Sequence, residues 1–387
     1  MSSIETGRTH VVHVFQSLNF SGAEVMYTQA APLFLQKGFD LTAIATQAEF
    51  GNYIEQFKQS GFTVQHMPQP KLSISNLVDF VLYFFRFYRF LINTDAAVLH
   101  IHRSTNYWFY SLCGYFAGTR TIRTFHSVFK NRKITWLKAY IERLTARKLL
   151  NVIFQSIGES VQRNEAIYYK SVTTRVNNWF DARSFYPPSG ADEIQQSRSD
   201  VGLSFSDFVI ISVGGCSEIK NHSDIIRALA LLPGDFNYLY LHLGSGHLEE
   251  EERTLAAKVL PPGRVRFIGN TTEVRKYLIA SDVFVMTSKL EGLGNAAVEA
   301  MGCGLPLVLY DVPGLRDLIQ NSNNGLLVQP SYQALASALM RLAEDQAIRT
   351  LMGKNAQCNA IASFSMHANV AKIIDLYLYG RTSSHTA

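Results

Sequence analysis

The stretch Asp282-Val-Phe-Val-Met-Thr287, followed after three residues by Glu291-Gly-Leu-Gly-Asn-Ala-Ala-Val-Glu299-Ala-Met-Gly-Cys-Gly-Leu-Pro306, predicts a strand, a turn and a helix start. The first run is apolar and predicts a buried strand, and Gly294 and Asn295 are suited to open the helix that follows. A helix N-terminus presents free N–H groups and a positive dipole, so it suits a phosphate. Seven small or apolar residues separate Glu291 from Glu299. Two carboxylates at such a turn suit polyol recognition or acid/base chemistry rather than core packing.

The same alternation of strand and helix runs through the whole chain. Continuous apolar strands separated by helices indicate a parallel sheet covered on both faces. Strands are expected at residues 11–15, 41–45, 97–101, 121–125, 152–155, 208–213, 238–243, 265–268, 283–286, 307–310 and 326–328. Helices are expected at residues 21–38, 225–232, 248–259, 273–280, 295–301 and 332–344. The predicted fold class is α/β, with two doubly wound, Rossmann-like halves whose ligands bind beyond the carboxyl ends of the strands.

A break separates the two halves. Tyr186-Pro-Pro-Ser-Gly-Ala-Asp192 combines proline, glycine and charge, and polar residues continue to Asp200, as in a linker. We therefore expect an N-terminal domain over residues 1–186 and a C-terminal domain over residues 187–365. With two halves, the cleft between them is the expected ligand site.

Size, charge and cysteine spacing narrow the class of protein. The chain has 387 residues, of which 47% are hydrophobic, enough for about two domains with cores of their own. A net charge of +5 is too modest to indicate nucleic acid. Cys113, Cys216, Cys303 and Cys358 form no CxxC pair, so we expect ordinary buried thiols and neither zinc nor disulfides. The first ten residues lack the apolar core of a signal peptide and no apolar run reaches 18 residues, so a cytoplasmic protein is expected.

Glycines follow three of the predicted strands. Gly22 opens a helix, either as a loop that closes over a substrate or as a plain turn. Gly214 and Gly215, followed by Lys220 at the next helix start, suit a diphosphate, although the spacing is not that of a P-loop and an exposed lysine is the alternative. Residues 244–246 form a third glycine turn, for which chain geometry is the favoured explanation over ligand contact.

One of the eleven histidines is a candidate for substrate contact. His126 falls at the end of a predicted parallel strand, a position that faces the ligand in this architecture. His13 and His100 lie within apolar strands, so we expect them to be hydrogen-bonded core residues.

Two segments raise the question of a membrane. Residues 82–91 are dense in aromatic side chains and contain two arginines, and residues 120–148 hold nine basic residues against Glu142, a local charge of +8. Such faces suit an anionic lipid surface or an anionic acceptor such as a lipid-linked pyrophosphate. A helix docked on its own sheet and a solvated basic face are the alternatives.

These motifs resemble those of the retaining GT-B glycosyltransferases of family 4, also called glycosyl transferases group 1. The Glu291–Glu299 spacing matches the family's Glu-x7-Glu motif, and the likeness covers nearly the whole chain. Further similar stretches are Asn19-Phe-Ser-Gly-Ala-Glu24, Thr124-Phe-His126, Asn177-Asn-Trp-Phe-Asp181 and the final helix at about residues 366–378. The resemblance implies that the segment at about 366–387 packs back on the N-terminal domain, which would be the acceptor side.

The resemblance also implies a role for each site residue. Glu291 would contact the donor sugar near the reacting carbon, with His126 as a second sugar contact. Glu299 would hold the donor ribose hydroxyls and Lys220 the diphosphate. The remaining donor-binding positions would act through the backbone, which cradles the base and the phosphates: Gly22, Gly214, Gly215, Ile268, Gly269, Leu293 and Gly294. The reaction would proceed with retention, with no metal, from a nucleotide sugar to a glycan or lipid-linked glycan acceptor.

One position departs from the family pattern. Val213-Gly-Gly-Cys216 stands where the family usually has Val-Gly-Arg-Leu, so Gly215 replaces an arginine that assists the diphosphate. Losing that charge-assisted contact would remove several kcal/mol of transition-state stabilisation unless another cation substitutes. The leading hypothesis is a glycosyltransferase of bacterial polysaccharide synthesis, peripheral on the inner face of the cytoplasmic membrane. The alternatives are a non-catalytic GT-B protein that binds a glycan or a partner, and an enzyme with a soluble acceptor.

Overall fold

The computed structural model of the chain describes residues 8–128, 133–321 and 323–382. These residues form two compact units: an N-terminal unit up to Asn178 that also includes the chain from Met366 onward, and a C-terminal unit from Trp179 to Ser365. The sequence-based boundary lies at 186/187, whereas the units change at 178/179. Trp179 and Phe180 are buried, and the N–H of Phe180 donates to the carbonyl of Phe364 at 3.1 Å. This pairing ties the chain to the C-terminal unit before the proline-rich stretch begins.

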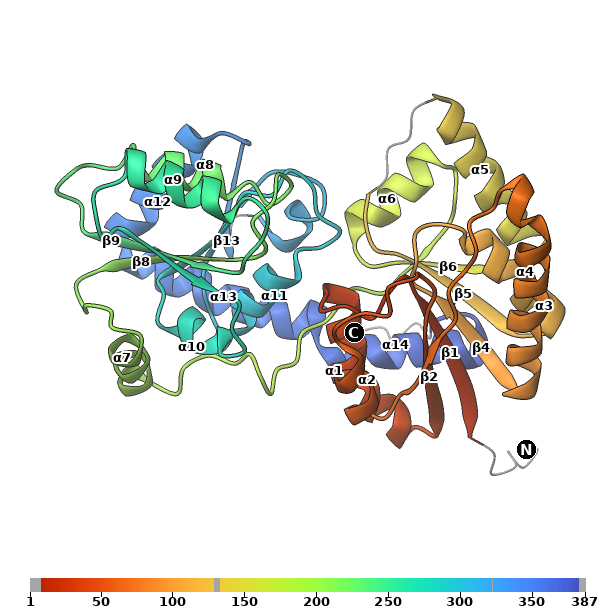
Figure 1. Cartoon of the computed structure of the whole chain (residues 1–387). Coiled ribbons are helices and arrows are strands. Elements are labelled where there is room, and N and C mark those ends of the chain that lie inside the picture. The colour runs from red at the N-terminus through yellow and green to blue at the C-terminus, as the bar shows by residue number, and fades with distance from the viewer. Residues whose placement is uncertain (1–7, 129–132, 322, 383–387) are drawn as a thin grey trace. The chain divides into compact units, whose positions relative to one another are not determined.

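The N-terminal unit is a seven-stranded parallel sheet with the order β3-β2-β1-β4-β5-β6-β7. Its strands are β1 Thr9–Phe15, β2 Phe39–Ala45, β3 Thr63–His66, β4 Ala96–Ile101, β5 Arg120–Phe125, β6 Ile153–Ser156 and β7 Thr174–Arg175. Its helices are α1 Gly22–Gln36, α2 Ile54–Gln59, the 3-10 turn η1 Ile74–Asn76, α3 Leu77–Asn93, α4 Tyr107–Ala117, α5 Lys133–Lys148, α6 Glu159–Tyr168 and α14 Met366–Tyr379. α3 packs against α4, and α1 packs against α14 (Figure 1).

The C-terminal unit is a six-stranded parallel sheet with the order β10-β9-β8-β11-β12-β13. Its strands are β8 Phe208–Val213, β9 Tyr238–Leu243, β10 Val265–Gly269, β11 Val283–Met286, β12 Leu307–Tyr310 and β13 Gly325–Val328. Its helices are α7 Ala191–Asp200, α8 His222–Leu229, α9 Glu249–Val259, α10 Val274–Ile279, α11 Asn295–Gly302, the 3-10 turn η2 Arg316–Leu318, α12 Tyr332–Glu344 and α13 Gln346–Phe364. Helix α8 packs against α9 and α12, whereas α11 packs against α13 (Figure 1).

Burial on both faces explains why the central strands were predictable. Val209, Ile210 and Ile211 of β8 have no exposed surface, nor have Val283 and Phe284 of β11. A strand covered by helices on both sides needs a continuous apolar run, which is the pattern that marks these segments in the sequence. The prediction of two doubly wound parallel α/β sheets is therefore confirmed.

The structure of the segment that precedes β8 differs from the prediction. The sequence predicts a polar linker up to Asp200, but α7 occupies Ala191–Asp200. The buried side chain of Arg198 explains the helix, because its guanidinium lies 2.7 Å from Asp282 and also donates to the carbonyl of Ala280 at 3.0 Å. This helix docks through an arginine, so it lacks the apolar periodicity that identifies most helices.

The short edge strands β3 and β7 and the long helix α13 also had no sequence prediction. The cysteine prediction is wrong at one position, since Cys113, Cys216 and Cys303 are buried but Cys358 is exposed. Among the described residues, no helix is both long and apolar enough to span a membrane.

Candidate functional site

The strand order of the C-terminal sheet places two loops side by side. β8 and β11 are neighbours although β9 and β10 lie between them in the chain. The direction in which successive strands are added to the sheet therefore reverses at this pair. The loops after both strands leave the same edge of the parallel sheet, which is where such folds bind ligands. The N–H of Lys289 donates to the carbonyl of Ile219 at 2.8 Å, and the hydroxyl of Thr287 donates to the carbonyl of Asn221 at 2.9 Å. These bonds join the two loops into one rim.

The predicted cation and the first predicted carboxylate meet on this rim. Nζ of Lys220 lies 2.6 Å from Oε1 of Glu291, and the two side chains are 29% and 14% exposed. A contact of this length between an ammonium and a carboxylate is a charge-assisted hydrogen bond. Because both groups keep some exposed surface, an anion can contact Lys220 while a hydroxyl group contacts Glu291.

Helix α11 begins at Asn295, four residues after Glu291, and the residue before it is a glycine that the turn requires. Gly294 is the N-cap residue with φ of +86°, in the left-handed region that disfavours other side chains. A Cβ atom added there would lie 2.8 Å from Cδ2 of Leu315. The first-turn N–H groups of a helix have no intrahelical partner. This end of α11, reached through Leu293 and Gly294, therefore offers donors and a positive dipole end to an anion.

Glu299 lies on α11, one helical turn beyond Asn295 and on the same face. Its side chain is partly buried, and desolvation raises the pKa of the carboxyl group to about 7. A carboxyl group with this pKa is close to half ionised at neutral pH. A ligand hydroxyl that donates to it would replace the lost hydration and favour the ionised form.

The predicted backbone contacts lie at the ends of two other strands. Gly214 and Gly215 directly follow β8, while Ile268 and Gly269 end β10 at the edge of the sheet. The carbonyl of Gly269 accepts a hydrogen bond of 2.8 Å from the N–H of Gly244. All four positions therefore lie at the carboxyl edge of the C-terminal sheet, which is the edge that carries Lys220 and Glu291.

Gly22 and His126 belong to the N-terminal unit. Gly22 is the exposed first residue of α1, after β1, and the hydroxyl of Ser21 donates to the carboxylate of Glu24 within the same turn. His126 follows β5 and is half-buried; desolvation first and the nearby Arg123 second lower the pKa of its imidazole to about 3. His126 is therefore a neutral group that can donate or accept one hydrogen bond at each nitrogen.

Sequence reasoning missed the residue that holds His126. Nδ1 of His102 lies 3.2 Å from Nε2 of His126, and Nε2 of His102 lies 2.9 Å from Nδ1 of His13. The interpretation of His13 and His100 as hydrogen-bonded core residues agrees with this arrangement, since His100 contacts Thr124 at 2.6 Å and the Tyr377 hydroxyl at 2.7 Å. The position of His102 one residue beyond β4 is the signal that could have marked it.

Several basic residues of the segment 120–148 do not reach the protein surface. Arg123 and Arg143 are buried; Arg123 lies over the rings of Tyr107 and Phe125, and Arg143 is paired with Glu165 at 2.6 Å. The local charge of +8 is therefore not a property of one solvated face. Lys130 and Arg132 of the same segment lie outside the described residues.

Comparison with known proteins finds both sequence relatives and similar folds. Residues 193–358 match the family described as glycosyl transferases group 1. The lipopolysaccharide core biosynthesis glycosyltransferase LpsE of Rhizobium meliloti is 34% identical over 171 residues, which are 44% of this chain and 48% of LpsE. The chain thus spans about half the length of this relative. The Escherichia coli UDP-Gal:alpha-D-GlcNAc-diphosphoundecaprenol alpha-1,3-galactosyltransferase is 22% identical over 95% of this chain and 96% of its own.

A solved structure extends the likeness to the fold of nearly the whole chain. HepE from Anabaena, crystallised in complex with UDP and glucose, superposes with a TM-score of 0.80 and 18% identity, covering 95% of this chain and 99% of that one. Two Rossmann-like sheets with this likeness give the chain the GT-B fold. The C-terminal residues 193–358 are thus similar to the glycosyl transferases group 1 family.

Proposed function

We propose that the chain is a retaining glycosyltransferase that transfers a sugar from a nucleotide-sugar donor to a growing, lipid-linked bacterial polysaccharide. The observation that carries the proposal is the 2.6 Å pair of Lys220 and Glu291 at the strand-order reversal of the C-terminal sheet. This pair presents a cation for a diphosphate directly beside a carboxylate for a sugar. The relatives named above, one from lipopolysaccharide core synthesis and one acting on a diphosphoundecaprenol-linked sugar, support the class of acceptor.

In the proposed reaction, the bond between the anomeric carbon and the phosphate oxygen breaks as the acceptor hydroxyl attacks the same face of the sugar. The hydroxyl proton leaves with the departing diphosphate oxygen, so no oxidant or reductant is needed. Negative charge grows on the diphosphate, where Lys220 and the N-terminus of α11 at Leu293 and Gly294 would stabilise it. We expect these groups, rather than a metal ion, to offset the charge of the leaving group. Glu291 would stabilise the positive charge that develops on the sugar ring.

The other donor contacts are proposals that follow from the family pattern. Glu299 would accept hydrogen bonds from the ribose hydroxyls, and the backbone at Ile268 and Gly269 would cradle the base. The backbone at Gly214 and Gly215 would approach the diphosphate from the end of β8. From the N-terminal unit, Gly22 and His126 would contact the phosphate and the sugar.

We further propose that the N-terminal unit works at an anionic membrane surface. Helix α3 has two apolar faces: Tyr83, Phe87 and Leu91 are buried in the unit, whereas the opposite face is exposed. Three residues at helical spacing form that exposed face, and they are 71%, 61% and 53% exposed in the order Val78, Leu82 and Phe85. Arg86 and Arg89 are exposed on the same helix. An apolar stripe beside arginines suits the interface of an anionic bilayer, where a lipid-linked acceptor would also lie.

The activity is tested on the purified chain by release of nucleoside diphosphate from a panel of nucleotide sugars, with and without lipid-linked acceptors. Glu291→Ala is expected to lower the rate about 100-fold or more, because it removes a charge aimed at the transition state. Glu251→Ala, which removes an exposed carboxylate from α9 of the same unit, is the matched control and should leave the rate unchanged. Full activity in Glu291→Ala would refute the assigned role.

Calorimetry separates the enzyme from the non-catalytic alternative that Gly215 suggests. If no nucleotide or nucleotide sugar binds the folded protein, the binding-protein alternative is favoured and the transferase proposal fails.

Vesicle flotation tests the membrane proposal. The chain should float with vesicles of phosphatidylglycerol but not with those of phosphatidylcholine, and Leu82→Glu with Phe85→Glu should abolish flotation. Equal recovery with both vesicle types, or none with either, would remove the membrane claim and favour a soluble acceptor.

A further inference from the structure

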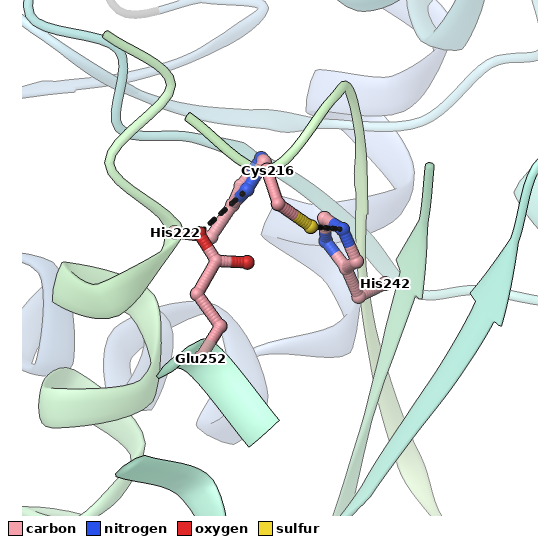
Figure 2. A group of neighbouring side chains, drawn as sticks. All are labelled: Cys216, His222, His242 and Glu252. Carbon is pink, nitrogen blue, oxygen red and sulfur yellow. Dashed lines mark hydrogen bonds and ion pairs between the residues drawn. The ribbon is translucent and has the colours of Figure 1, made fainter. Parts of the chain in front are cut away.

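The C-terminal unit contains a second cluster of reactive side chains: Cys216, His222, His242 and Glu252 (Figure 2). They come from four elements, namely the loop after β8, the first residue of α8, β9 and α9. All four residues are buried, with exposed fractions between 0% and 4%. Such a set of polar groups in a protein interior needs partners that satisfy it.

The spacing of the ligand atoms fits one small cation. Sγ of Cys216 lies 3.2 Å from Nε2 of His242, and Nδ1 of His222 lies 3.5 Å from Oε1 of Glu252. All four ligand atoms lie within 4.8 Å of one another. Zinc bonds of about 2.0–2.3 Å in a tetrahedron separate the ligand atoms by roughly 3.3–3.8 Å. Two pairs are already close to this separation, and the others, at up to 4.8 Å, need to close by at most about 1.5 Å.

Two atoms of the cluster lack the hydrogen bonds that buried polar atoms normally make. Nδ1 of His222 has no contact closer than its 3.5 Å ion pair with Oε1 of Glu252, and Oε2 of Glu252 has no hydrogen-bond partner among the described residues. Nδ1 of His242, in contrast, lies 3.2 Å from the hydroxyl of Ser212. A histidine that donates through Nδ1 presents the lone pair of Nε2 to a metal, which is the usual support for a ligating imidazole. The unsatisfied atoms and the supported one therefore both point to a cation at the centre of the cluster.

We propose that Cys216, His222, His242 and Glu252 bind one Zn²⁺ ion. A thiolate, two imidazoles and a carboxylate form a donor set that suits zinc better than magnesium or calcium, which prefer oxygen ligands. Four protein ligands leave no open position for water, so the ion would be structural. This proposal departs from the sequence-based expectation of no zinc, which rested on the lack of a CxxC spacing among the cysteines and on the family resemblance.

The proposed ion would fix the loop that carries Lys220. Cys216 and His222 flank this loop, and a zinc ion would tie both of its ends to β9 and α9. The backbone at Cys216 already lies close to the loop between β9 and α9, since a Cβ atom added at Gly246 of that loop would lie 2.3 Å from the carbonyl oxygen of Cys216. A thiolate and a carboxylate neutralise the two charges of zinc, so the ion would position the loop without replacing the missing arginine at Gly215.

The histidine trio of the N-terminal unit is a weaker candidate for a metal site. His13, His100 and His102 also lie within ligand distance of one another. However, their nitrogens contact each other, Thr124, Tyr377 and His126, and the trio contains no thiolate or carboxylate.

Metal analysis of the 387-residue chain, purified without a polyhistidine tag or chelator, tests the proposal. The wild type should contain about one zinc per chain, and Cys216→Ser and Glu252→Gln should each contain less than about a tenth of this amount. Cys113→Ser is the matched control, because it alters a buried cysteine of the other unit and should keep the zinc. Removal of zinc should lower the melting temperature of the wild type but not that of the two cluster variants.

Replacement of zinc by Co²⁺ in the wild type gives a readout that does not depend on folded variants. A thiolate ligand should produce a charge-transfer band together with the visible bands of tetrahedral cobalt. A folded wild type that binds neither zinc nor cobalt would overturn the proposal. So would a Cys216→Ser variant that retains its zinc, or a cobalt spectrum without a thiolate band. None of these outcomes depends on transferase activity, so they are distinct from a failure of the proposed function.

Discussion

The pH dependence of donor binding tests the proposed role of Glu299 without removal of its side chain. Its partly buried carboxyl group has a pKa of about 7, because burial disfavours the ionised form. Under the proposed function, the ribose hydroxyls donate hydrogen bonds to the ionised carboxylate. The raised pKa places the ionised form above pH 7 and the protonated form below it. Donor affinity should therefore increase as the pH rises from 6 to 8.

The magnitude follows from the ionised fraction. With a pKa of about 7, roughly one carboxyl group in eleven is ionised at pH 6 and ten in eleven at pH 8. If only the ionised form binds, affinity changes about 10-fold, or ~1.4 kcal/mol. The nearby Cys303 thiol does not titrate in this range, because burial raises its pKa to about 12.

Isothermal titration calorimetry at pH 6, 7 and 8 measures this effect directly. The ligand should be the nucleotide sugar that most stabilises the protein in a thermal-shift screen, because its doubly esterified diphosphate does not titrate in this range. In two buffers of different ionisation enthalpy, about half a proton should be released per donor bound at pH 7.

Glu299→Gln is the control for the pH dependence. Any donor binding that remains in the variant should have one affinity at all three pH values and release no proton. Without ligand, the variant should also be more stable than the wild type at pH 8, by up to about 3 kcal/mol. The reason is that the free energy of unfolding of the wild type falls as the pH rises from the carboxyl group's unfolded pKa to about 7, whereas glutamine does not ionise. Equal wild-type affinity at pH 6 and pH 8, with no proton release, would refute the reasoning.

Two further predictions concern stability. Arg143→Ala should lower the free energy of unfolding by about 3–5 kcal/mol, because it leaves Glu165 charged and buried without its partner. The control Arg163→Ala breaks an exposed ion pair and should lower the free energy of unfolding by less than about 1 kcal/mol. Similar losses for the two variants in urea denaturation would contradict the argument. Gly294→Ala should destabilise the protein and weaken donor binding, since its Cβ atom would contact Leu315 at 2.8 Å. Gly263→Ala isolates the backbone part of that cost, because Gly263 has a similar φ of +83° and nothing within 4 Å, so equal melting temperatures would show that the side-chain contact is harmless.

The fold was predictable where burial forces a simple pattern. The strands β8, β9, β11 and β12 begin and end at the predicted residues, because strands covered on both faces need continuous apolar runs between polar turns. Elements held by other forces were not predictable. Helix α7 docks through Arg198, and its ion pair with Asp282 joins residues 84 positions apart. The edge strand β3 alternates exposed and half-exposed residues, so it carries no apolar run.

The candidate site divides in the same way. The sequence by itself determined the chemical types at the strand ends: Lys220 after one strand, and Glu291 and Glu299 around one helix start. Only the tertiary structure decided that Lys220 and Glu291 touch, since 71 positions separate them and the strand order, not the chain order, makes β8 and β11 neighbours. Desolvation of Glu299 is likewise a property of the packed helix, because the pKa of a carboxyl group depends on the surroundings that only folding supplies.

The proposed zinc ligands are the clearest case of information that the sequence lacks. Zinc sites can be predicted from sequence when their ligands fall in short, fixed spacings such as CxxC. Here the four ligands come from a loop, two helices and a strand, and in the sequence Cys216 and Glu252 resemble any buried thiol and any helix glutamate. The sequence determined that two parallel sheets form and which chemistry lies at their edges. The tertiary structure decided which of those groups meet, because side chains far apart in the chain become neighbours only through the order of the strands.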